Sequence, residues 1–419
     1  MKCGWDVSIR LFNNFVMFLT LARFLIHQLL MYKAFKYRIY PSTSQKELIA
    51  KHIGSSRFVY NLALETKNVV YTSCKHNYTA FDLIKQLVDL KKEYPWLKEV
   101  NSQSLQQSIQ NMDNAFKKFF NGSGFPKFKK KSNSGSFSIP QNVVVENNLL
   151  IIPKFKDGIC VKLHRPIKGV IKSATISVTP TGKYLVSILC DSRESVPTKA
   201  IIEEATTIGI DLGIKDFAIT SDGEVFNNLK FLRKAQSKLK FTQRKFSKKK
   251  GKRTKKRLTK LHEKVVNKRK DFLHKVSTKL IRENQTIALE TLLVKNMVKN
   301  HSLSQSISDA SWSTFVDMLE YKANWYGKNI LKIGTFEPSS KTCGCCGAIN
   351  KDLKIKDREW TCGSCGTLLD RDLNAAINIK NFSLKNILSG TDSKNQDELP
   401  MLLGVMTPEA QPIAYGVGE

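Results

Sequence analysis

The sequence predicts a multidomain α+β protein, in which a β-rich domain with a helical insertion precedes an α/β domain interrupted by a four-cysteine zinc ribbon. Short β-like runs separated by turn residues fill positions 137–192. Apolar stripes at helical spacing lie between 43 and 122. From 205 onward, buried strand-like runs alternate with helical segments, and two cysteine pairs fall inside this region. A length of 419 residues suits two or three such domains.

The first half begins with a strand-like segment and continues with helical segments. Residues 32–41 alternate as a strand does. Ser44 and Glu47 match the capping-box pattern, so a helix is expected to begin there. Two further helices are expected over residues 80–92 and 102–121.

The β-rich part contains two expected hairpins. The run VVVENNLLIIP turns at Glu146-Asn147-Asn148, and the run ATISVTPTGKYLVSILC turns at Thr-Gly. A glycine-, serine- and lysine-rich loop, GSGFPKFKKKSNSGSF, precedes them. A linker is expected near 193–205, ahead of the second half.

The charge balance is the feature that restricts function most. Lys and Arg total 68 against 36 Asp and Glu, which gives a formal net charge of +32. An excess of this size indicates a polyanionic partner, of which nucleic acid is the commonest. A passive RNA-binding protein would show the same charge, so the balance alone does not indicate an enzyme.

The positive charge is concentrated between Lys230 and Arg282, with 23 Lys or Arg against two acids, Glu263 and Asp271. The near absence of Gly and Pro predicts two long helices joined near KKKGKR. Like charges on a free helix repel, and a phosphate backbone would relieve that repulsion. The expected nucleic-acid-binding residues surround the junction: Lys248, Lys249, Lys250, Lys252, Arg253, Lys255, Lys256 and Arg257.

The first thirty residues include an apolar run that polar and charged side chains interrupt, among them Arg10 and Arg23. A membrane-spanning helix needs about 20 predominantly apolar residues, and no small-residue cleavage site follows the run. We therefore expect no membrane association and a cytoplasmic location. MYKAFKYRIYP resembles the beginning of a domain, so residues 1–30 are expected to be an artefactual extension ahead of a true start at Met31. The alternative is a real amphipathic arm.

The nine cysteines are unevenly distributed, and five of them fall between 343 and 365. Two regular pairs, Cys343/Cys346 and Cys362/Cys365, have the spacing of a structural zinc ribbon. Gly347 and Gly366 follow the pairs and permit sharp turns. We expect these four thiolates to bind one Zn²⁺, although Cys345 lies between two of them and could compete.

Three carboxylates lie at the ends of expected core elements that are far apart in the sequence. Asp211 follows the buried run TIGI, Glu290 ends QTIALE, and Asp372 begins the helix in DRDLNAAINI. An RNase H-like sheet gathers acids in this way to hold Mg²⁺, which prefers oxygen ligands and assists phosphodiester cleavage. Asp211 could instead begin a turn, Glu290 could be a surface residue where its strand ends, and Asp372 could be only a helix N-cap. Asp216, Asp222 and Asp370 are competitors, and spacing alone does not separate Asp370 from Asp372.

Several segments together resemble the TnpB (OrfB) family of insertion-sequence proteins, which is similar to the nuclease lobe of type V CRISPR effectors. The segments are AFKYRIYPSTSQKELIAKHIGSSRFVYNLALE, GIDLGIKDFAITSDG, SLSQSISDASWSTFVDMLEYKANWYG, FEPSSKTCGCCG and WTCGSCGTLLDRDLNAAINI. The resemblance covers about residues 31–385, and its last third is the most specific. One departure from the family pattern is Thr291, where many members carry a second acid after the glutamate. That acid is not a metal ligand in the family.

The resemblance implies an RNA-guided, Mg²⁺-dependent DNA endonuclease with a single RuvC-like active site. Asp211, Glu290 and Asp372 match the family's catalytic acids, and the four paired cysteines match its zinc ligands. The implied partners are a guide RNA from the transposon end and double-stranded target DNA, cut next to a short adjacent motif. A catalytically inactive nucleic-acid-binding regulator and a strand-transferring transposase remain as alternatives, although the separated histidines do not suit the latter.

The resemblance also implies a domain organisation. The expected parts are a wedge domain over 31–42 and 123–204, a helical recognition insertion over 43–122, a RuvC-like domain over 205–340 and 367–385, and a zinc ribbon over 341–366. Residues 386–419 lie outside the resemblance and are expected to form a disordered tail.

Overall fold

The computed structural model describes residues 30–132, 134–354 and 356–389. The expected N-terminal extension, apart from its last residue, and most of the expected tail lie outside these ranges. The chain divides into two compact units between Ser195 and Val196. Both combine helices with a sheet, so the expected α+β class is confirmed.

The first unit is built on a seven-stranded sheet whose order is β2-β6-β7-β1-β5-β4-β3. The N-terminal strand β1 lies in the middle of this sheet, antiparallel to both β5 and β7. The strands are β1 (Leu30–Tyr40), β2 (Gly135–Ile139), β3 (Val144–Glu146), β4 (Leu149–Ile152), β5 (Phe155–Lys162), β6 (Val170–Val178) and β7 (Tyr184–Ser195).

Both expected hairpin turns of this sheet are confirmed. Asn147 and Asn148 join β3 to β4 with φ of 49° and 60°, a left-handed backbone that asparagine tolerates better than most residues. Gly182, with φ of 80°, lies in the turn between β6 and β7.

Helices fill the chain between β1 and β2 and share their own apolar core, which includes Leu64, Leu97, Leu105 and Met112. The helices are α2 (Thr43–Cys74), α3 (Ala80–Lys85), α4 (Leu87–Glu93), the 3₁₀ helix η1 (Pro95–Glu99) and α5 (Ser102–Phe120). The expected helix over 80–92 is therefore two short helices, α3 and α4.

The expected capping box of the first long helix is wrong by two residues. Ser42 caps α2, since its Oγ accepts the Gln45 amide at 3.3 Å while Gln45 Oε1 accepts the Ser42 amide at 3.0 Å. Ser42-x-x-Gln45 satisfies the same pattern as Ser44-x-x-Glu47. The earlier serine is used because its backbone is still extended after the strand.

The second unit contains a five-stranded sheet whose order is β10-β9-β8-β11-β12. β8 and β9 are antiparallel, as are β9 and β10, whereas β11 is parallel to both β8 and β12. The strands are β8 (Thr207–Asp211), β9 (Asp216–Thr220), β10 (Val225–Asn227), β11 (Thr286–Glu290) and β12 (Asn329–Ile333), and the hairpin β13 (Glu359–Thr361) and β14 (Leu368–Asp370) stands apart.

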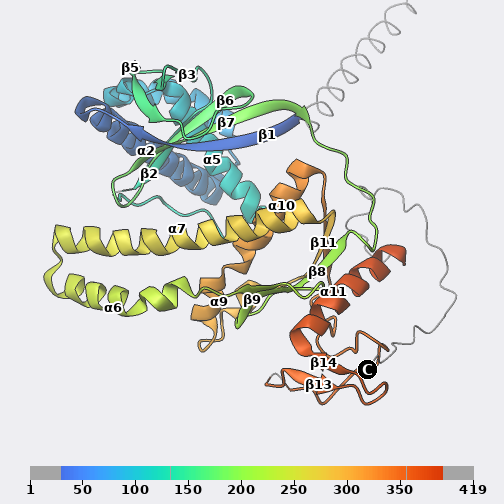
Figure 1. The fold of residues 1–419 in the computed structure, drawn as a ribbon. Coiled ribbons are helices and arrows are strands. Elements are labelled where there is room, and N and C mark those ends of the chain that lie inside the picture. The colour runs from blue at the N-terminus through green and yellow to red at the C-terminus, as the bar shows by residue number, and fades with distance from the viewer. Residues whose placement is uncertain (1–29, 133, 355, 390–419) are drawn as a thin grey trace, which may run out of the picture. The chain divides into compact units, whose positions relative to one another are not determined.

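Helices pack against this sheet, and α11 crosses β8, β11 and β12 (Figure 1). The helices are α6 (Phe231–Lys249), α7 (Lys252–Glu283), α8 (Val294–Met297), α9 (Ser304–Ala310), α10 (Trp312–Tyr326) and α11 (Arg371–Leu388). The helix α11 corrects the expected tail, because residues 386–388 are helical. The expected linker near 193–205 contains the boundary between the two units, although it begins later than expected, because residues 193–195 belong to β7. No helix or strand lies between Ser195 and Thr207, and the Ala200 amide donates to Gly327 O at 2.9 Å within the second unit.

A buried lysine ties α10 to α7. Lys322 is 6% exposed, and its Nζ donates to Ser277 Oγ at 2.7 Å, Thr278 Oγ1 at 2.7 Å and His274 O at 3.0 Å. Burial lowers the pKa of Lys322 to about 8, because the charged form loses hydration.

Replacing Lys322 with methionine is expected to flatten the pH dependence of stability. An unfolded lysine has a pKa near 10.4, so the folded protein binds fewer protons between about pH 8 and 10.4. The wild type should gain up to about 3 kcal/mol in free energy of unfolding over that window relative to Lys322→Met, and lose it as the pH falls. Urea titrations of both proteins at pH 7.5 and 10 measure this, and parallel profiles would contradict it.

Among the described residues, no helix is both long enough and apolar enough to cross a membrane.

Candidate active site and cysteine cluster

Three expected site residues come together at one end of the second sheet. Asp211 is the last residue of β8 and Glu290 the last of β11, and the two strands pair in parallel up to Ile210 and Leu289. Asp372 lies in the first turn of α11, which packs on β8. Parallel strands therefore bring two carboxylates to the same edge, and a crossing helix adds the third.

Gly209 explains how α11 can approach β8 so closely. A Cβ atom at this position would lie 2.1 Å from Ala376 O and 2.7 Å from the Lys380 amide nitrogen. Any side chain would push the helix away from the strand. The glycine in IGIDLG thus sets the distance between the strand that carries Asp211 and the helix that carries Asp372.

The pKa values of two of the acids depart from their ordinary values. Burial first, then repulsion from Asp372 and Glu290, raise the pKa of Asp211 to about 7. Burial also raises the pKa of Glu290. Like charges gathered in a partly dehydrated site favour protonation, unless a cation is present to offset them. The donor set is therefore suited to a divalent metal with oxygen ligands.

The two aspartates of the DRD triplet have different surroundings. Asp370 caps α11, and its Oδ1 accepts the amides of Asp372 at 3.0 Å and Leu373 at 2.8 Å. The carboxylate of Asp372 instead accepts Arg371 Nη2 at 2.7 Å and Arg358 Nη1 at 2.8 Å. Repulsion from Asp372 also contributes to the raised pKa of Asp211.

A groove of about 860 Å³ opens beside these acids, lined by Asp211 and Asp372 but not by Glu290. Five basic side chains also line the groove: Lys215, Lys230, Arg233, Arg358 and Arg371. The groove can thus accommodate an anionic polymer next to the carboxylates. The sequence reasoning missed Arg358 and Arg371, which belong to no regular spacing that could have revealed them.

The four paired cysteines form one cluster whose Sγ atoms all lie within 4.8 Å of one another. Cys343 Sγ is 3.7 Å from Cys365 Sγ, and Cys346 Sγ is 3.6 Å from Cys362 Sγ. Zn–S bonds of about 2.3 Å in a tetrahedron require sulfur separations of about 3.8 Å. The cluster could therefore hold zinc, and Cys345 is exposed outside it.

Each cysteine pair lies in a tight turn that closes on a glycine. The Gly347 amide donates to Cys343 O at 2.9 Å, and the Gly366 amide donates to Cys362 O at 2.9 Å. Both glycines have positive φ, 77° and 70°, as their positions after the pairs predicted.

Two buried asparagines fasten the first cysteine turn to α11. Asn374 Oδ1 accepts the Gly344 amide at 2.8 Å, and Asn374 Nδ2 donates to Thr342 O at 2.7 Å. Asn378, one turn further along, donates to Thr342 O at 2.6 Å and Ser339 O at 2.7 Å. The helix that begins beside Asp372 is therefore also the support of the cysteine cluster.

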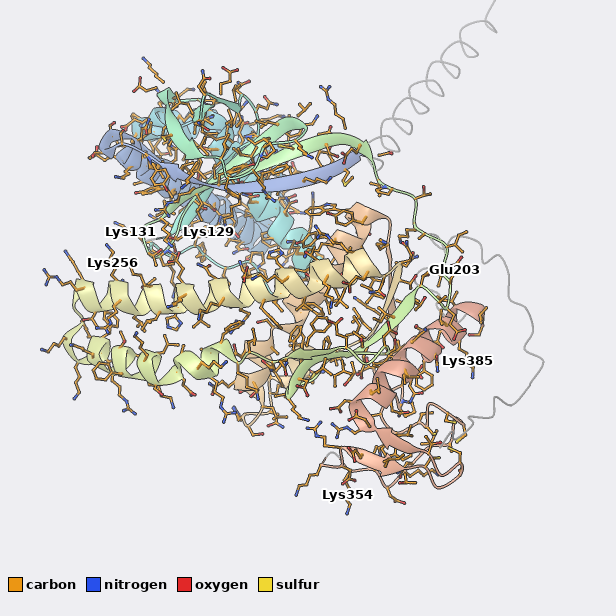
Figure 2. The ribbon with its side chains drawn as sticks, viewed as in Figure 1. Lys129, Lys131, Glu203, Lys256, Lys354 and Lys385 are labelled. Atoms are coloured by element: carbon orange, nitrogen blue, oxygen red, sulfur yellow. The ribbon has the colours of Figure 1, made fainter. Side chains whose placement is uncertain are left out.

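The basic tract forms the expected pair of helices, α6 and α7, which run side by side and are joined at Lys250 and Gly251 (Figure 1). All eight expected binding residues are exposed, and Figure 2 shows Lys256 near the free end of the pair. At the other end, Asp309 Oδ2 accepts the Leu232 amide at 2.9 Å and Asp309 Oδ1 accepts Arg269 Nη2 at 2.9 Å. This buried carboxylate, also missed in the sequence, joins α9 to both helices.

Comparison with known families gives three matches along the chain. A "Helix-turn-helix domain" model matches residues 31–76, a "Probable transposase" model of the OrfB_IS605 family matches 187–301, and a "Cas12f1-like, TNB domain" model matches 312–379. The first of these segments consists here of β1 and the single long helix α2.

Two curated relatives extend over most of the chain. A "Putative RNA-guided DNA endonuclease" of Streptomyces pristinaespiralis is 36% identical and covers 87% of this chain and 93% of its own length. A "Putative RNA-guided DNA endonuclease InsQ" of Escherichia coli K12 is 31% identical, and the match covers 83% of this chain and 91% of the relative. A solved structure, a Cas12f1–sgRNA–target DNA complex, has a similar fold with a TM-score of 0.52 at 14% identity, covering 84% of this chain and 99% of the Cas12f1 chain.

A mixed α+β chain with converging carboxylates and a four-cysteine cluster is consistent with a nucleic-acid enzyme. The extent and identity of the curated matches show that the chain belongs to the TnpB (OrfB) family.

Proposed function

We propose that this protein is an RNA-guided DNA endonuclease of an insertion sequence, with one Mg²⁺-dependent active site formed by Asp211, Glu290 and Asp372. The observation that carries the proposal is the convergence of these three acids from β8, β11 and α11 at one edge of a sheet. The names of the curated relatives support the reaction and the guide.

The topology of the second unit supports a RuvC-like, RNase H-related nuclease domain. Its sheet has three antiparallel strands, β8 to β10, followed by two strands parallel to β8 on the other side. This arrangement places the ends of β8 and β11 next to each other. The zinc-ribbon assignment of residues 341–366 rests on the cysteine cluster and its two glycine turns.

The chain's own residues would hold and orient the reacting groups. Mg²⁺, when bound, would help to generate the attacking hydroxide and stabilise the leaving oxygen. Asp211 and Glu290, fixed at strand ends, would supply oxygen ligands. Arg358 and Arg371 keep the Asp372 carboxylate in place, and both guanidinium groups line the groove where a phosphate would lie.

Sequence selection would come from base pairing between guide RNA and target DNA, while the protein holds the backbones. The exposed basic residues of α6 and α7 would contact phosphates and carry no sequence preference. The first unit would correspond to the wedge domain with its helical recognition insertion, and would contact the short motif beside the target.

The test is to purify the protein with its bound RNA, sequence that RNA, and supply DNA matching the candidate guide segment. We expect one RNA species from the transposon end, and Mg²⁺-dependent cleavage of matched DNA beside a short constant motif. RNA binding without any cleavage would favour a catalytically inactive regulator, and no bound RNA would contradict the proposal.

A further inference from the structure

An exposed aromatic group stands at the end of α5 in the first unit. Phe120 is 77% exposed and Phe125 is 49% exposed, which is unusual for large apolar side chains. Both rings contact other aromatic rings. The ring centre of Phe119 lies 5.3 Å from those of Phe120 and Phe125, and the ring centre of Phe116 lies 5.6 Å from that of Phe125. Because Phe116 is buried in the helical core, the exposed rings rest on a fixed base.

The loop that follows α5 is also fixed in position. Asn61 on α2 bonds the backbone of Lys129 twice, donating to its carbonyl at 3.0 Å and accepting its amide at 2.8 Å. The Lys129 Nζ lies 3.8 Å from the centre of the Tyr60 ring. A surface that is already ordered before a partner binds loses less conformational freedom on binding.

The sequence around these rings is strongly basic. The sequence between Asp113 and Glu146 contains six lysines and no acid. Lys118, Lys127, Lys130 and Lys131 are exposed, and Figure 2 shows Lys129 and Lys131 on this loop. Lys117 bonds Asp113 at 3.2 Å, yet its side chain remains 71% exposed.

We propose that this surface, the aromatic–lysine ridge of residues 116–131, stacks an unpaired nucleobase of the guide RNA on Phe120. The proposal rests on the proposed function and adds a contact that the active site does not require. Exposed aromatic rings stack on bases, and lysines beside them bind the flanking phosphates. Single-stranded RNA loops offer unstacked bases, whereas a DNA duplex keeps its bases stacked, so RNA is the better occupant.

Phe120→Ala is expected to weaken binding of the transcribed guide RNA about 5- to 150-fold, the range that one lost aromatic–base stack gives. Phe120→Tyr should bind as the wild type does, because the ring is kept. Phe120→Leu should bind as poorly as the alanine variant, although it keeps apolar area. Phe81→Ala is the matched control, since Phe81 is 65% exposed on another helix of the same unit.

Salt dependence separates stacking from charge. Phe120→Ala removes no charge, so the slope of log affinity against log salt should be unchanged. The double variant Lys248→Ala/Lys249→Ala should make that negative slope shallower by about 1.4, since each phosphate contact to a single strand contributes about 0.7.

The outcomes distinguish this inference from the proposed function. If Phe120→Ala binds guide RNA as tightly as the wild type and still cuts guided DNA, the proposed base stacking on Phe120 is wrong and the proposed function stands. If Phe120→Leu binds guide RNA fully, the occupant is an apolar group rather than a stacked base. If Phe120→Ala loses affinity only for single-stranded DNA of the same sequence, the guide RNA is not the occupant. A wild-type protein that binds no RNA would overturn both.

Discussion

Asp211→Ala is expected to lower guided DNA cleavage by about three orders of magnitude or more while leaving RNA affinity within a few-fold of wild type. The variant loses a proposed metal ligand, and the metal-assisted step depends on it. The exposed cations of α6 and α7 are untouched, so binding should persist. Single-turnover cleavage with guide RNA, matched DNA and Mg²⁺ measures the rate, and a retained rate would show that this carboxylate is not a ligand.

A second measurement on the same variant does not depend on cleavage. Mg²⁺ binds only the folded site, so it should raise the thermal midpoint of the wild type. Asp211→Ala should lose that increase. Without Mg²⁺ the variant should be at least as stable as the wild type, because burial and two neighbouring acids destabilise the charged form of Asp211.

Asp370→Asn and Asp372→Asn are the matched pair for the DRD triplet. Asparagine caps helices about as well as aspartate, so Asp370→Asn should fold and cut almost normally. Asp372→Asn should lose cleavage as Asp211→Ala does. The reverse result would assign the third ligand to Asp370.

Cys346→Ser is expected to reduce bound zinc from one equivalent to none and to abolish cleavage. Structural zinc contributes on the order of 10 kcal/mol to small zinc folds, so the region around the cluster should unfold. The loss should reach the active site, because Asn374 and Asn378 hold the first cysteine turn on the helix that begins beside Asp372. RNA affinity should change little.

Cys345→Ser is the control, since Cys345 is exposed and outside the cluster. It should keep its zinc and its activity. Metal analysis of both variants, purified without chelators, decides the matter: equal zinc in Cys346→Ser and wild type would rule out the assignment.

The sequence predicted those parts of the site that depend on local pattern. Asp211 and Glu290 could be found because each ends a short apolar run, and the cysteines because their spacing is regular. The long helices and both hairpin turns follow from apolar spacing and from residues that tolerate positive φ.

Three of the residues that were missed, apart from the two arginines, act through partners remote in the sequence. Asn374 bonds Thr342, Asp309 bonds Arg269, and Lys322 bonds Ser277, each across thirty or more positions. No local pattern marks such pairs, because a buried asparagine or aspartate in a helix resembles any other polar residue until the fold is known. Local errors had a different cause: Ser42 and Ser44 both satisfy the capping pattern, and only the strand before them decides between them.

The two faces of α11 limit how the chain can change length during evolution. One added residue between Asp372 and Asn374 would turn the rest of the helix by about 100° relative to its first turn. If the asparagines kept the cysteine turn and the Ala376 backbone still faced Gly209, the Asp372 carboxylate would be turned away from Asp211. Insertions and deletions should therefore be absent from this stretch among functional relatives, whereas the exposed turn at Lys351 and Asp352 should tolerate changes in length.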